Sequence, residues 1–498
     1  TGLQTTRFRE EARSIIASCV GATDEHAVLF CGSGATGAID KLIGVLGLRV
    51  PSSLDDRYGV TARIDPDERT VVFIGPYEHH SNELPWRESI ADVVIIDEDV
   101  TGHVDLEHLE RELVRYADRP LKIGSFSAAS NVTGMRTPVH EIARLLHRYD
   151  AIACFDFAAS APYVEIDMNP PADRFEGDAS IDAVFISPNK FLGGPGSSGV
   201  LVFNKRIYNR ALPPSVSAGG TVDYVGPSSQ DFIHSIEERE KAGTPGVLQI
   251  LKAGMAFQLK DQLGVEAIEK RERALLARTF KRWRNNANIE ILGNPDPDRR
   301  ISIVSFNLRD HRGKYLHPKF VTTLLNDLFG IQSRAGCSCA GPYGHRLLDI
   351  GFEKSEQYRK WINKGFSGIK PGWCRISLHY AMDDIEVGFI LDAIDFVAEW
   401  GHRFLPLYHF DMNTGAWTHK VDCVCLEGFS LDAALECGGY QSRALSRGER
   451  RTLYSAFLNE ARQLAEELDE PLTPGTQDAD QELESLKFFS VPDQSVSM

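Results

Sequence analysis

Short apolar runs recur along the first part of the chain, and stretches with the apolar spacing of helices separate several of them. The runs that predict strands lie at 27–30, 70–74, 92–96, 121–126, 151–155, 183–186 and 199–203. Helical patterns lie at 106–116 and 139–149. Strands alternating with helices indicate a mostly parallel sheet with helices on both faces. We therefore expect an α/β fold built on a mostly parallel seven-stranded sheet, with ligands bound beyond the C-terminal ends of its strands.

The second half of the chain predicts further, smaller units. A helical stretch at 247–285 leads to strand candidates at 289–292, 301–307 and 375–378 and to a helix at 384–400, with one more helix near 446–468. The last stretch is rich in Gln, Asp, Glu and Ser, a composition typical of disorder. The expected organisation is a large ligand-binding domain (1–260), a smaller α/β C-terminal domain (261–405), a partly helical extension (406–472) and a disordered tail (473–498).

Composition narrows the class of protein. The 498 residues are 42% hydrophobic and 25% charged, as in globular proteins, and the formal net charge is −16. That charge argues against a nucleic-acid binder, which needs a basic face. The sequence contains no run of about 18 apolar residues, so no membrane span is predicted. The nine cysteines do not suggest a disulfide framework, and the chain begins without Met. We expect a missing natural N-terminus and a cytoplasmic or organellar protein that is not secreted.

Two glycine-rich motifs follow strand candidates. Residues 31–37, Cys-Gly-Ser-Gly-Ala-Thr-Gly, follow the first strand and open a helix. They form either a tight turn or a phosphate site at a helix N-terminus. Residues 187–196, Ser-Pro-Asn-Lys-Phe-Leu-Gly-Gly-Pro-Gly, place Lys190 at the mouth of the sheet. Lys190 is either an ordinary surface lysine or an amine that desolvation turns into a nucleophile.

Polar residues follow two other strands. Asp156 ends the run at 151–155, where its carboxylate can either cap a local turn or pair with a protonated ring nitrogen. Glu78-His79-His80-Ser81-Asn82 follows the run at 70–74. His79 can stack on a flat ring or move protons. Neighbouring histidines also suggest a metal, but adjacent side chains diverge on a strand or a helix, so no metal site is predicted here.

A cysteine-bearing loop lies in the second half of the chain. Arg334-Ala-Gly-Cys337-Ser-Cys339 is followed within a few residues by His345. The thiols suggest either zinc or an accessible nucleophile. Arg375, at the start of a predicted strand, can clamp a carboxylate with both guanidinium nitrogens. Cys423 and Cys425 of the extension are expected to be ordinary buried or solvent-exposed thiols.

Taken in order, these motifs resemble one family. The series is the small-residue turn, Glu-His-His, Ser-Asn-Val-Thr-Gly, the strand-end Asp, Lys-Phe-Leu-Gly-Gly-Pro, Ala-Gly-Thr-Pro-Gly, Arg-Ala-Gly-Cys-Ser-Cys and Arg-Ile-Ser. Over residues 6–400 the chain resembles the class V aminotransferases, which are fold-type I enzymes of pyridoxal 5'-phosphate (PLP). Within that family it is most similar to the cysteine desulfurase and selenocysteine lyase branch.

The resemblance implies a role for each matching residue. Lys190 would hold PLP as a Schiff base, Asp156 would pair with the ring nitrogen and His79 would stack on the ring. The remaining cofactor contacts implied are Ala35, Thr36 and Ser187 to the phosphate, Asn131 near the ring oxygen and the substrate, and Thr244 to the phosphate of a neighbouring subunit. The family therefore implies a homodimer with shared active sites.

The implied reaction is desulfuration of L-cysteine, or removal of selenium from selenocysteine. Arg375 and Arg334 would bind the substrate, and Cys339 would take up the sulfur as a persulfide for a possible acceptor protein. The alternatives are another class V reaction, such as transamination, epimerisation or C–S cleavage without a persulfide, and a PLP-fold subunit that only binds partners. Ala159 and Asn189 replace the usual glutamine and histidine of the family, which puts the desulfurase assignment in question more than the cofactor.

Overall fold

The computed structural model describes residues 2–421, 430–436, 444–468 and 481–491. Two compact units divide the chain. Unit 1 comprises Thr1–Ala274, Asp296–Ile301 and Cys339–Tyr343, and unit 2 comprises Leu275–Pro295, Ser302–Ser338 and Gly344–Met498. The segment Cys339–Tyr343, which begins at the last cysteine of the cysteine motif, therefore belongs to unit 1.

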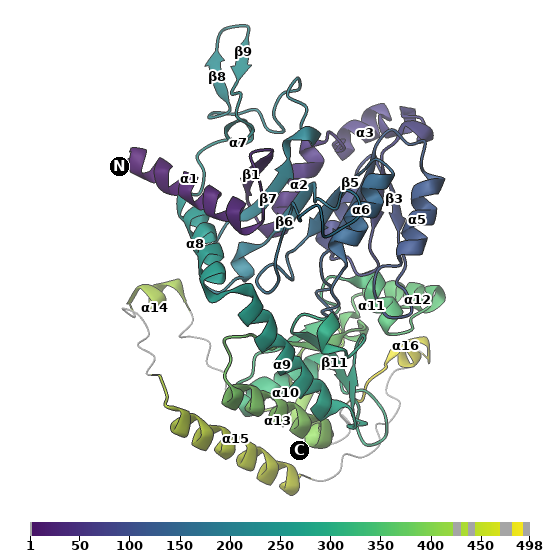
Figure 1. The fold of residues 1–498 in the computed structure, drawn as a ribbon. Helices are drawn as coiled ribbons and strands as arrows, with labels where there is room; N and C mark the ends of the chain where they lie inside the picture. The colour runs from purple at the N-terminus through teal and green to yellow at the C-terminus, as the bar shows by residue number, and fades with distance from the viewer. Residues whose placement is uncertain (1, 422–429, 437–443, 469–480, 492–498) are drawn as a thin grey trace. The chain divides into compact units, whose positions relative to one another are not determined.

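Unit 1 is built on a seven-stranded sheet (Figure 1). Its strands run in the order β1-β7-β6-β5-β4-β2-β3, and within the block β6-β5-β4-β2-β3 every neighbouring pair is parallel. β7 alone pairs antiparallel with both of its neighbours. The predicted mostly parallel seven-stranded sheet is thus confirmed. The strands are β1 (His26–Cys31), β2 (Val71–Ile74), β3 (Asp92–Ile95), β4 (Lys122–Ser127), β5 (Ala151–Asp156), β6 (Ala183–Ile186) and β7 (Gly199–Asn204).

Helices cover both faces of this sheet because successive side chains of each strand point to opposite faces. On one face, α2 (Gly34–Val45) and Trp86 of α4 (Leu84–Arg87) share a buried cluster with alternate strand residues such as Val72 and Ile74. On the other face, α6 (Val139–Arg148) packs on β5, and α5 (Leu106–Arg115) lies against α6.

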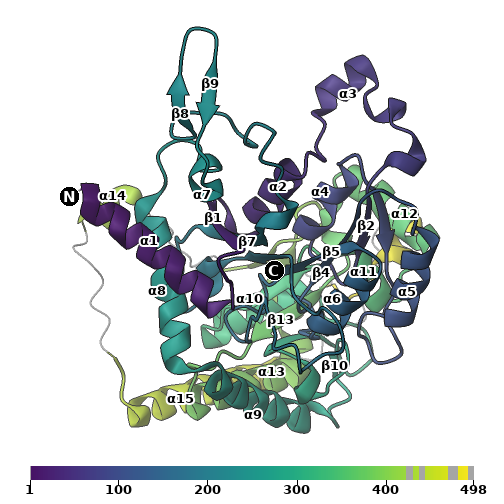
Figure 2. The ribbon, with the colours of Figure 1, turned by 45° about the horizontal axis from the view of Figure 1, so that its top comes forward.

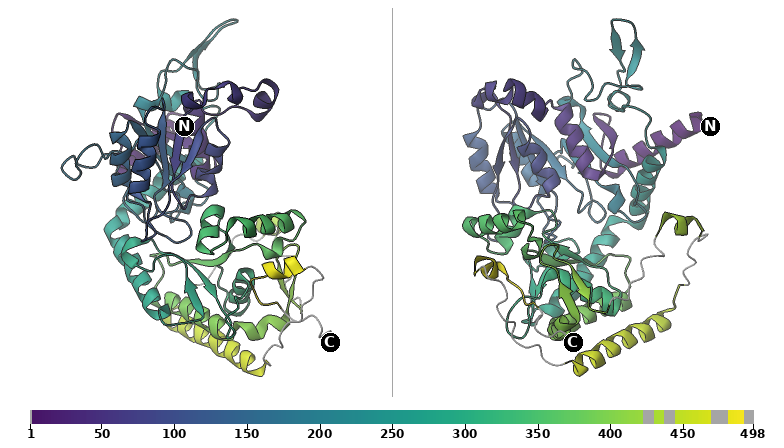
Figure 3. Two further views of the ribbon diagram at one scale, coloured as in Figure 1. Left: turned by 90° about the vertical axis from the view of Figure 1, so that its right-hand side faces the viewer. Right: turned by 180° about the vertical axis from the view of Figure 1, so that it is seen from behind.

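Further elements of unit 1 lie outside the sheet. Helix α1 (Gly2–Cys19) packs against α8 (Val247–Leu263), as the right panel of Figure 3 shows. Figure 2 shows the hairpin of β8 (Val222–Val225) and β9 (Gln230–Phe232) extending away from the sheet of this unit. The helical stretch predicted at 247–285 is two helices, because Gly264 with φ of 81° ends α8 before α9 (Val265–Trp283) begins. The remaining helices are α3 (Ser52–Tyr58) and α7 (Ile236–Arg239), with 3-10 turns η1 (Thr61–Arg63), η2 (Pro66–Glu68), η3 (His80–Asn82), η4 (Pro188–Lys190), η5 (Lys205–Ile207) and η6 (Pro297–Arg299).

Unit 2 contains an antiparallel sheet in the order β10-β11-β13-β12. Its strands are β10 (Ile289–Ile291), β11 (Ile303–Leu308), β12 (Arg334–Gly336) and β13 (Trp373–Ser377). Its core joins these strands to the long helices, with Phe306, Phe320, Leu324 and Ile394 almost fully buried. The other elements are α10 (Pro318–Phe329), α11 (Gly341–Leu347), α12 (Phe352–Asn363), η7 (Ser367–Ile369), α13 (Asp384–Trp400), η8 (Gly401–Leu407), β14 (Tyr408–Phe410), β15 (Trp417–His419), α14 (Leu431–Glu436), α15 (Arg447–Glu467) and α16 (Gln481–Leu486).

Part of the tail that was expected to be disordered is folded. Residues 481–491 contain α16 and bury Leu486 and Phe489 to 1% and 2% exposure. The Tyr358 hydroxyl donates to the Leu486 carbonyl over 3.1 Å, and Phe489 pairs with Tyr315 as a parallel bridge. A few well-placed apolar side chains thus override the polar composition. The rest of the predicted tail, and Cys423 and Cys425, lie outside the described residues.

Candidate active site

Several of the predicted site residues meet at one edge of the unit 1 sheet. Asp156 is the last residue of β5, and Ser187 follows β6 directly. His79 follows β2 after a short link, and η4 carries Lys190. Because the carboxyl ends of parallel strands lie at the same edge of the sheet, these side chains lie near one another although they are far apart in sequence.

The turn between β1 and α2 is joined to the lysine motif by one hydrogen bond. The Ser187 hydroxyl accepts a hydrogen bond of 2.8 Å from the Ala35 amide, at the first turn of α2. Gly34 has φ of +58°, and a Cβ there would lie 2.7 Å from Ser187 Oγ. Thr36 Oγ1 lies 2.7 Å from Ser81 Oγ. Backbone N–H groups at a helix N-terminus, with hydroxyls beside them, make a cradle suited to a phosphate.

Asp156 is a buried carboxylate close to a charged amine. It is 4% exposed, and its Oδ1 accepts a 2.8 Å hydrogen bond from the Ala158 amide. Burial raises the pKa of Asp156, while that amide and the charge of Lys190 act in the opposite direction. An acid with this balance can hold a proton or a positive ring nitrogen at the floor of the site.

Lys190 is exposed at the end of η4. Of the two alternatives that the sequence left open for this residue, the exposure agrees with a surface lysine and not with an amine desolvated by burial. The loop that follows is tight, because a Cβ at Gly194 would overlap the Pro188 carbonyl.

His79 stands over a buried hydrogen-bond network. Its Nδ1 accepts from the Ser81 amide at 3.1 Å. Glu78, just before it, accepts four hydrogen bonds, from Gly75 N, Ser127 N, Ser127 Oγ and Asn82 Nδ2. Burial raises the pKa of Glu78 to about 7, against the lowering effect of these donors. Sequence reasoning placed Glu78 in a motif but missed its role of tying β2 to β4, because its partner on β4, Ser127, lies 49 residues downstream.

The asparagine loop and the cysteine segment meet inside unit 1. Asn131 is half-buried in a loop closed by the Ser130 hydroxyl, which accepts from the amides of Val132 and Thr133. Thr133 Oγ1 lies 3.1 Å from the Tyr343 hydroxyl. This contact joins the loop of Asn131 to the segment Cys339–Tyr343. Cys339 itself is half-buried, whereas Cys337 is exposed.

The two predicted arginines belong to unit 2. Arg334 in β12 pairs in register with Arg375 in β13, so the two side chains are cross-strand neighbours. Arg334 is exposed and Arg375 half-buried. Guanidinium groups bind carboxylates through two parallel N–H donors, so a cross-strand pair of arginines has the chemistry of a carboxylate site.

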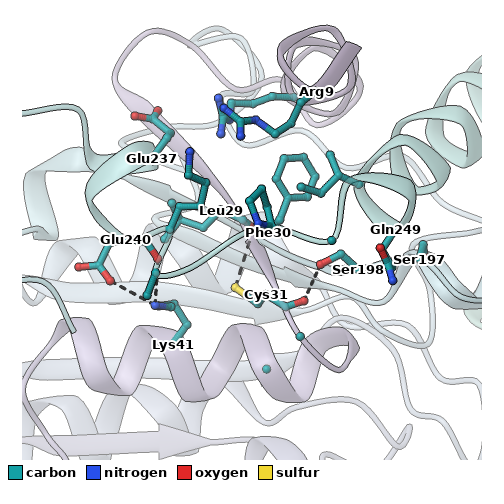
Figure 4. A pocket seen from close by; sticks show the side chains of 18 of the residues that line it. Arg9, Leu29, Phe30, Cys31, Lys41, Ser197, Ser198, Glu237, Glu240 and Gln249 are labelled. Carbon is teal, nitrogen blue, oxygen red and sulfur yellow. Dashed lines mark hydrogen bonds and ion pairs between the residues drawn. The ribbon is translucent and has the colours of Figure 1, made fainter. Parts of the chain in front are cut away.

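Thr244 lies elsewhere in unit 1. It lines a cavity of about 700 Å³, together with Arg9, Ser198 and other residues, and neither Lys190 nor Asp156 lines that cavity. Figure 4 shows this pocket, in which Lys41 pairs with Glu240 over 3.2 Å and Ser198 Oγ donates to the Cys31 carbonyl over 2.7 Å. The structure thus does not bring Thr244 to the lysine of its own chain.

Comparison with known proteins now decides the family. The family model described as Aminotransferase class-V matches residues 1–389. The chain belongs to the class-V aminotransferase family. Relatives in this family include a "Probable cysteine desulfurase" of Halalkalibacterium halodurans, 28% identical over 353 residues, which cover 70% of this chain and 77% of the relative. A protein of the same name from Streptomyces coelicolor is 27% identical over 343 residues, or 68% and 74% of the two chains.

Solved structures agree with the fold of the family. The apo cysteine desulfurase of Thermococcus onnurineus NA1 superposes with a TM-score of 0.62 at 22% identity, over 80% of this chain and 85% of that one. The cysteine desulfurase CsdA of Escherichia coli gives 0.60 at 20%, over 79% and 84%. The predicted class V membership and fold type are thereby confirmed. None of the described helices has the length and apolar character needed to cross a membrane. Within the same residues, no three His, Cys, Asp or Glu side chains gather as metal ligands would.

Proposed function

We propose that this chain is a PLP-dependent, cysteine desulfurase-like enzyme that removes sulfur from L-cysteine, or selenium from selenocysteine. The observation that carries the proposal is the meeting, at one sheet edge, of a lysine, a buried carboxylate and a helix N-terminus with hydroxyls beside it. The family is PLP-dependent, and its members in the comparisons carry the name cysteine desulfurase.

The donor set fits PLP. The cofactor has a phosphate, a ring nitrogen and an aldehyde, which call for an anion cradle, an acid and an amine. The amide of Ala35 and the hydroxyls of Thr36 and Ser187 would hold the phosphate. Asp156 would keep a proton on the ring nitrogen, and Lys190 would bind the aldehyde carbon.

When bound, PLP supplies an electron sink for the α-carbon of the amino acid. The side chains of the chain do the rest. Lys190 would take the proton from the substrate Cα, and its side chain is exposed at the sheet edge where the substrate would bind. His79 would stack on the ring and limit access of water, while Asn131 would orient the substrate.

Substrate binding and sulfur transfer use groups of the second half of the chain. Arg375, with Arg334 beside it, binds the substrate carboxylate. The Cys339 thiolate then attacks the substrate sulfur, so that an S–S bond forms as the C–S bond breaks. Cβ takes up one proton as the C–S bond breaks, Lys190 returns the proton to Cα, and alanine leaves. Cys339 keeps the sulfur as a persulfide for an acceptor protein.

We also propose that the enzyme works as a homodimer with shared active sites. Thr244 lines a pocket that Lys190 of the same chain does not line. In the proposed dimer, Thr244 would instead contact the phosphate of the PLP bound to the partner subunit. The departures at Ala159 and Asn189 do not involve the hydrogen bond from the Ala35 amide to the Ser187 hydroxyl, which joins the two glycine-rich motifs.

The test is alanine formation and persulfide detection with L-cysteine as substrate. Cys339→Ala is expected to lose both while keeping the absorbance of bound PLP. Cys337→Ala is the matched control, because that thiol is exposed and two residues away, and it should keep both products. Wild-type alanine formation by Cys339→Ala would refute the persulfide role and favour C–S cleavage of another kind.

A further inference from the structure

The segment that follows Cys339 is held by the histidine next to His79. His80 donates its backbone N–H to the Cys339 carbonyl over 2.8 Å. Its side chain accepts through Nε2 from the Gly341 amide over 3.0 Å. His80 alone thus forms hydrogen bonds with two successive peptide groups of the cysteine segment, which lies 261 residues downstream.

The backbone at this point needs such support. Ser338 has φ of 53° and Cys339 has φ of 56°, two consecutive non-glycine residues in the left-handed region. That conformation is costly for side chains with a Cβ and persists only where surrounding contacts fix it. Ala340, which follows, is fully buried. The two hydrogen bonds of His80 act where the strained backbone ends.

A second anchor lies at the far end of the segment. Tyr343 is 2% exposed, and its ring packs edge-on against Tyr77 with centroids 5.6 Å apart. Its hydroxyl lies 3.1 Å from Thr133 Oγ1. Tyr343 fixes the start of α11, but it is four residues from Cys339. His80 acts on the thiol-bearing residue itself, through the hydrogen bond to the Cys339 carbonyl.

We propose that His80 is a positioning residue for Cys339, acting through the acceptor Nε2 on Gly341 and the backbone bond to the Cys339 carbonyl. The inference rests on the proposed role of Cys339 in sulfur transfer. The acceptor function requires that Nε2 carry no proton, and any side chain with an acceptor at that reach can replace it. His80 does not touch the cofactor in this account, so its loss slows the sulfur step and spares the earlier proton step.

Hydrogen exchange and turnover of the PLP-loaded protein test this inference. His80→Phe keeps a flat ring without an acceptor, and His80→Gln restores an acceptor. His140→Phe is the matched control, since the His140 ring also makes one 3.0 Å bond to a backbone group, the Ala179 carbonyl. His80→Leu replaces the phenylalanine variant if that protein does not fold.

The expected result is about fivefold faster amide exchange at Gly341 in His80→Phe, the size of one lost neutral hydrogen bond. Alanine formation from L-cysteine falls by a similar factor, while exchange of the substrate Cα proton with solvent and the PLP absorbance stay as in wild type. His80→Gln recovers both, and His140→Phe changes neither.

Two outcomes overturn the proposal. One is unchanged amide exchange at Gly341 in His80→Phe, and the other is an equal fall of Cα-proton exchange and alanine formation, which would place His80 at the cofactor. Absence of alanine in the wild-type protein would instead refute the proposed function, and the exchange comparison at Gly341 would still decide the role of His80.

Discussion

Replacing Gly34 by alanine probes the turn on which the phosphate cradle depends. Gly34 has φ of +58°, and the methyl group would lie 2.7 Å from Ser187 Oγ and 3.3 Å from Asn189 Oδ1. Ser187 Oγ cannot retreat without losing its 2.8 Å hydrogen bond from the Ala35 amide. The substitution therefore strains the backbone and breaks the link between the two glycine-rich motifs.

The size of the loss in stability follows from the backbone strain at residue 34 and from the broken hydrogen bond to Ser187. A left-handed conformation costs an alanine about 1–2 kcal/mol. The lost hydrogen bond to Ser187 adds about 0.5–1.5 kcal/mol. Gly34→Ala should thus lower the free energy of unfolding of unit 1 by about 1.5–3.5 kcal/mol.

Gly32 provides a control within the same motif. A methyl group at Gly32 meets nothing within 4 Å, and its φ is not positive, so Gly32→Ala should change the free energy of unfolding by less than about 0.5 kcal/mol. The assay is hydrogen exchange of β1 and β7 peptides at increasing urea, with a parallel titration of the apoprotein with PLP. Equal stability and equal PLP affinity of the two variants would refute the reasoning.

Three further predictions address the carboxylates and the folded tail. Asp156→Asn cannot keep a proton on the ring nitrogen, so alanine formation should fall by about 10²-fold or more while PLP stays bound, and an unchanged rate would exclude that role. Burial raises the pKa of Glu78 to about 7, so the folded state binds the proton more tightly than the unfolded state; its stabilising contribution is full below about pH 4.5 and is lost as the pH rises to 7. Between pH 4.5 and 7 the free energy of unfolding of the wild-type protein, measured by urea titration, should fall by about 3 kcal/mol relative to that of Glu78→Gln. If the difference in unfolding free energy between the two proteins does not vary with pH, the pKa of Glu78 is not raised. Phe489→Ala empties a site that is 2% exposed and should cost unit 2 about 3–5 kcal/mol in the same assay, whereas Phe352→Ala, at 82% exposure, should cost less than about 0.5 kcal/mol.

The large sheet was predictable because its strands, apart from the partly exposed β3, are buried on both faces. Each appears in the sequence as a run of apolar, often β-branched residues with turn residues at its ends, and the run at 183–186 matches β6 to the residue. The hairpin of β8 and β9 was not predicted, since its first strand exposes Asp223, Tyr224 and Val225 and so carries no burial pattern. β12 is three residues long and offers no period at all.

The candidate site was predictable only where a residue directly follows a strand. Asp156, Ser187 and His79 meet because parallel strands end together. The sequence left open whether Lys190 is exposed or desolvated, because the motif does not predict the 3-10 turn that carries it. The hydrogen bond between His80 and Gly341 joins residues 261 positions apart, and no local sequence pattern predicts such a pair.

The proposed function requires that the amine of Lys190 bind PLP covalently. Borohydride reduction of the PLP-loaded protein makes this bond permanent and so allows it to be located. Peptide mapping should find the reduced cofactor on Lys190 in stoichiometric amount, and Lys190→Ala should carry none. Lys260 is the sharpest competitor, since burial lowers the pKa of its amine to about 8. Label on Lys260 with none on Lys190, or no label on either, would contradict the account.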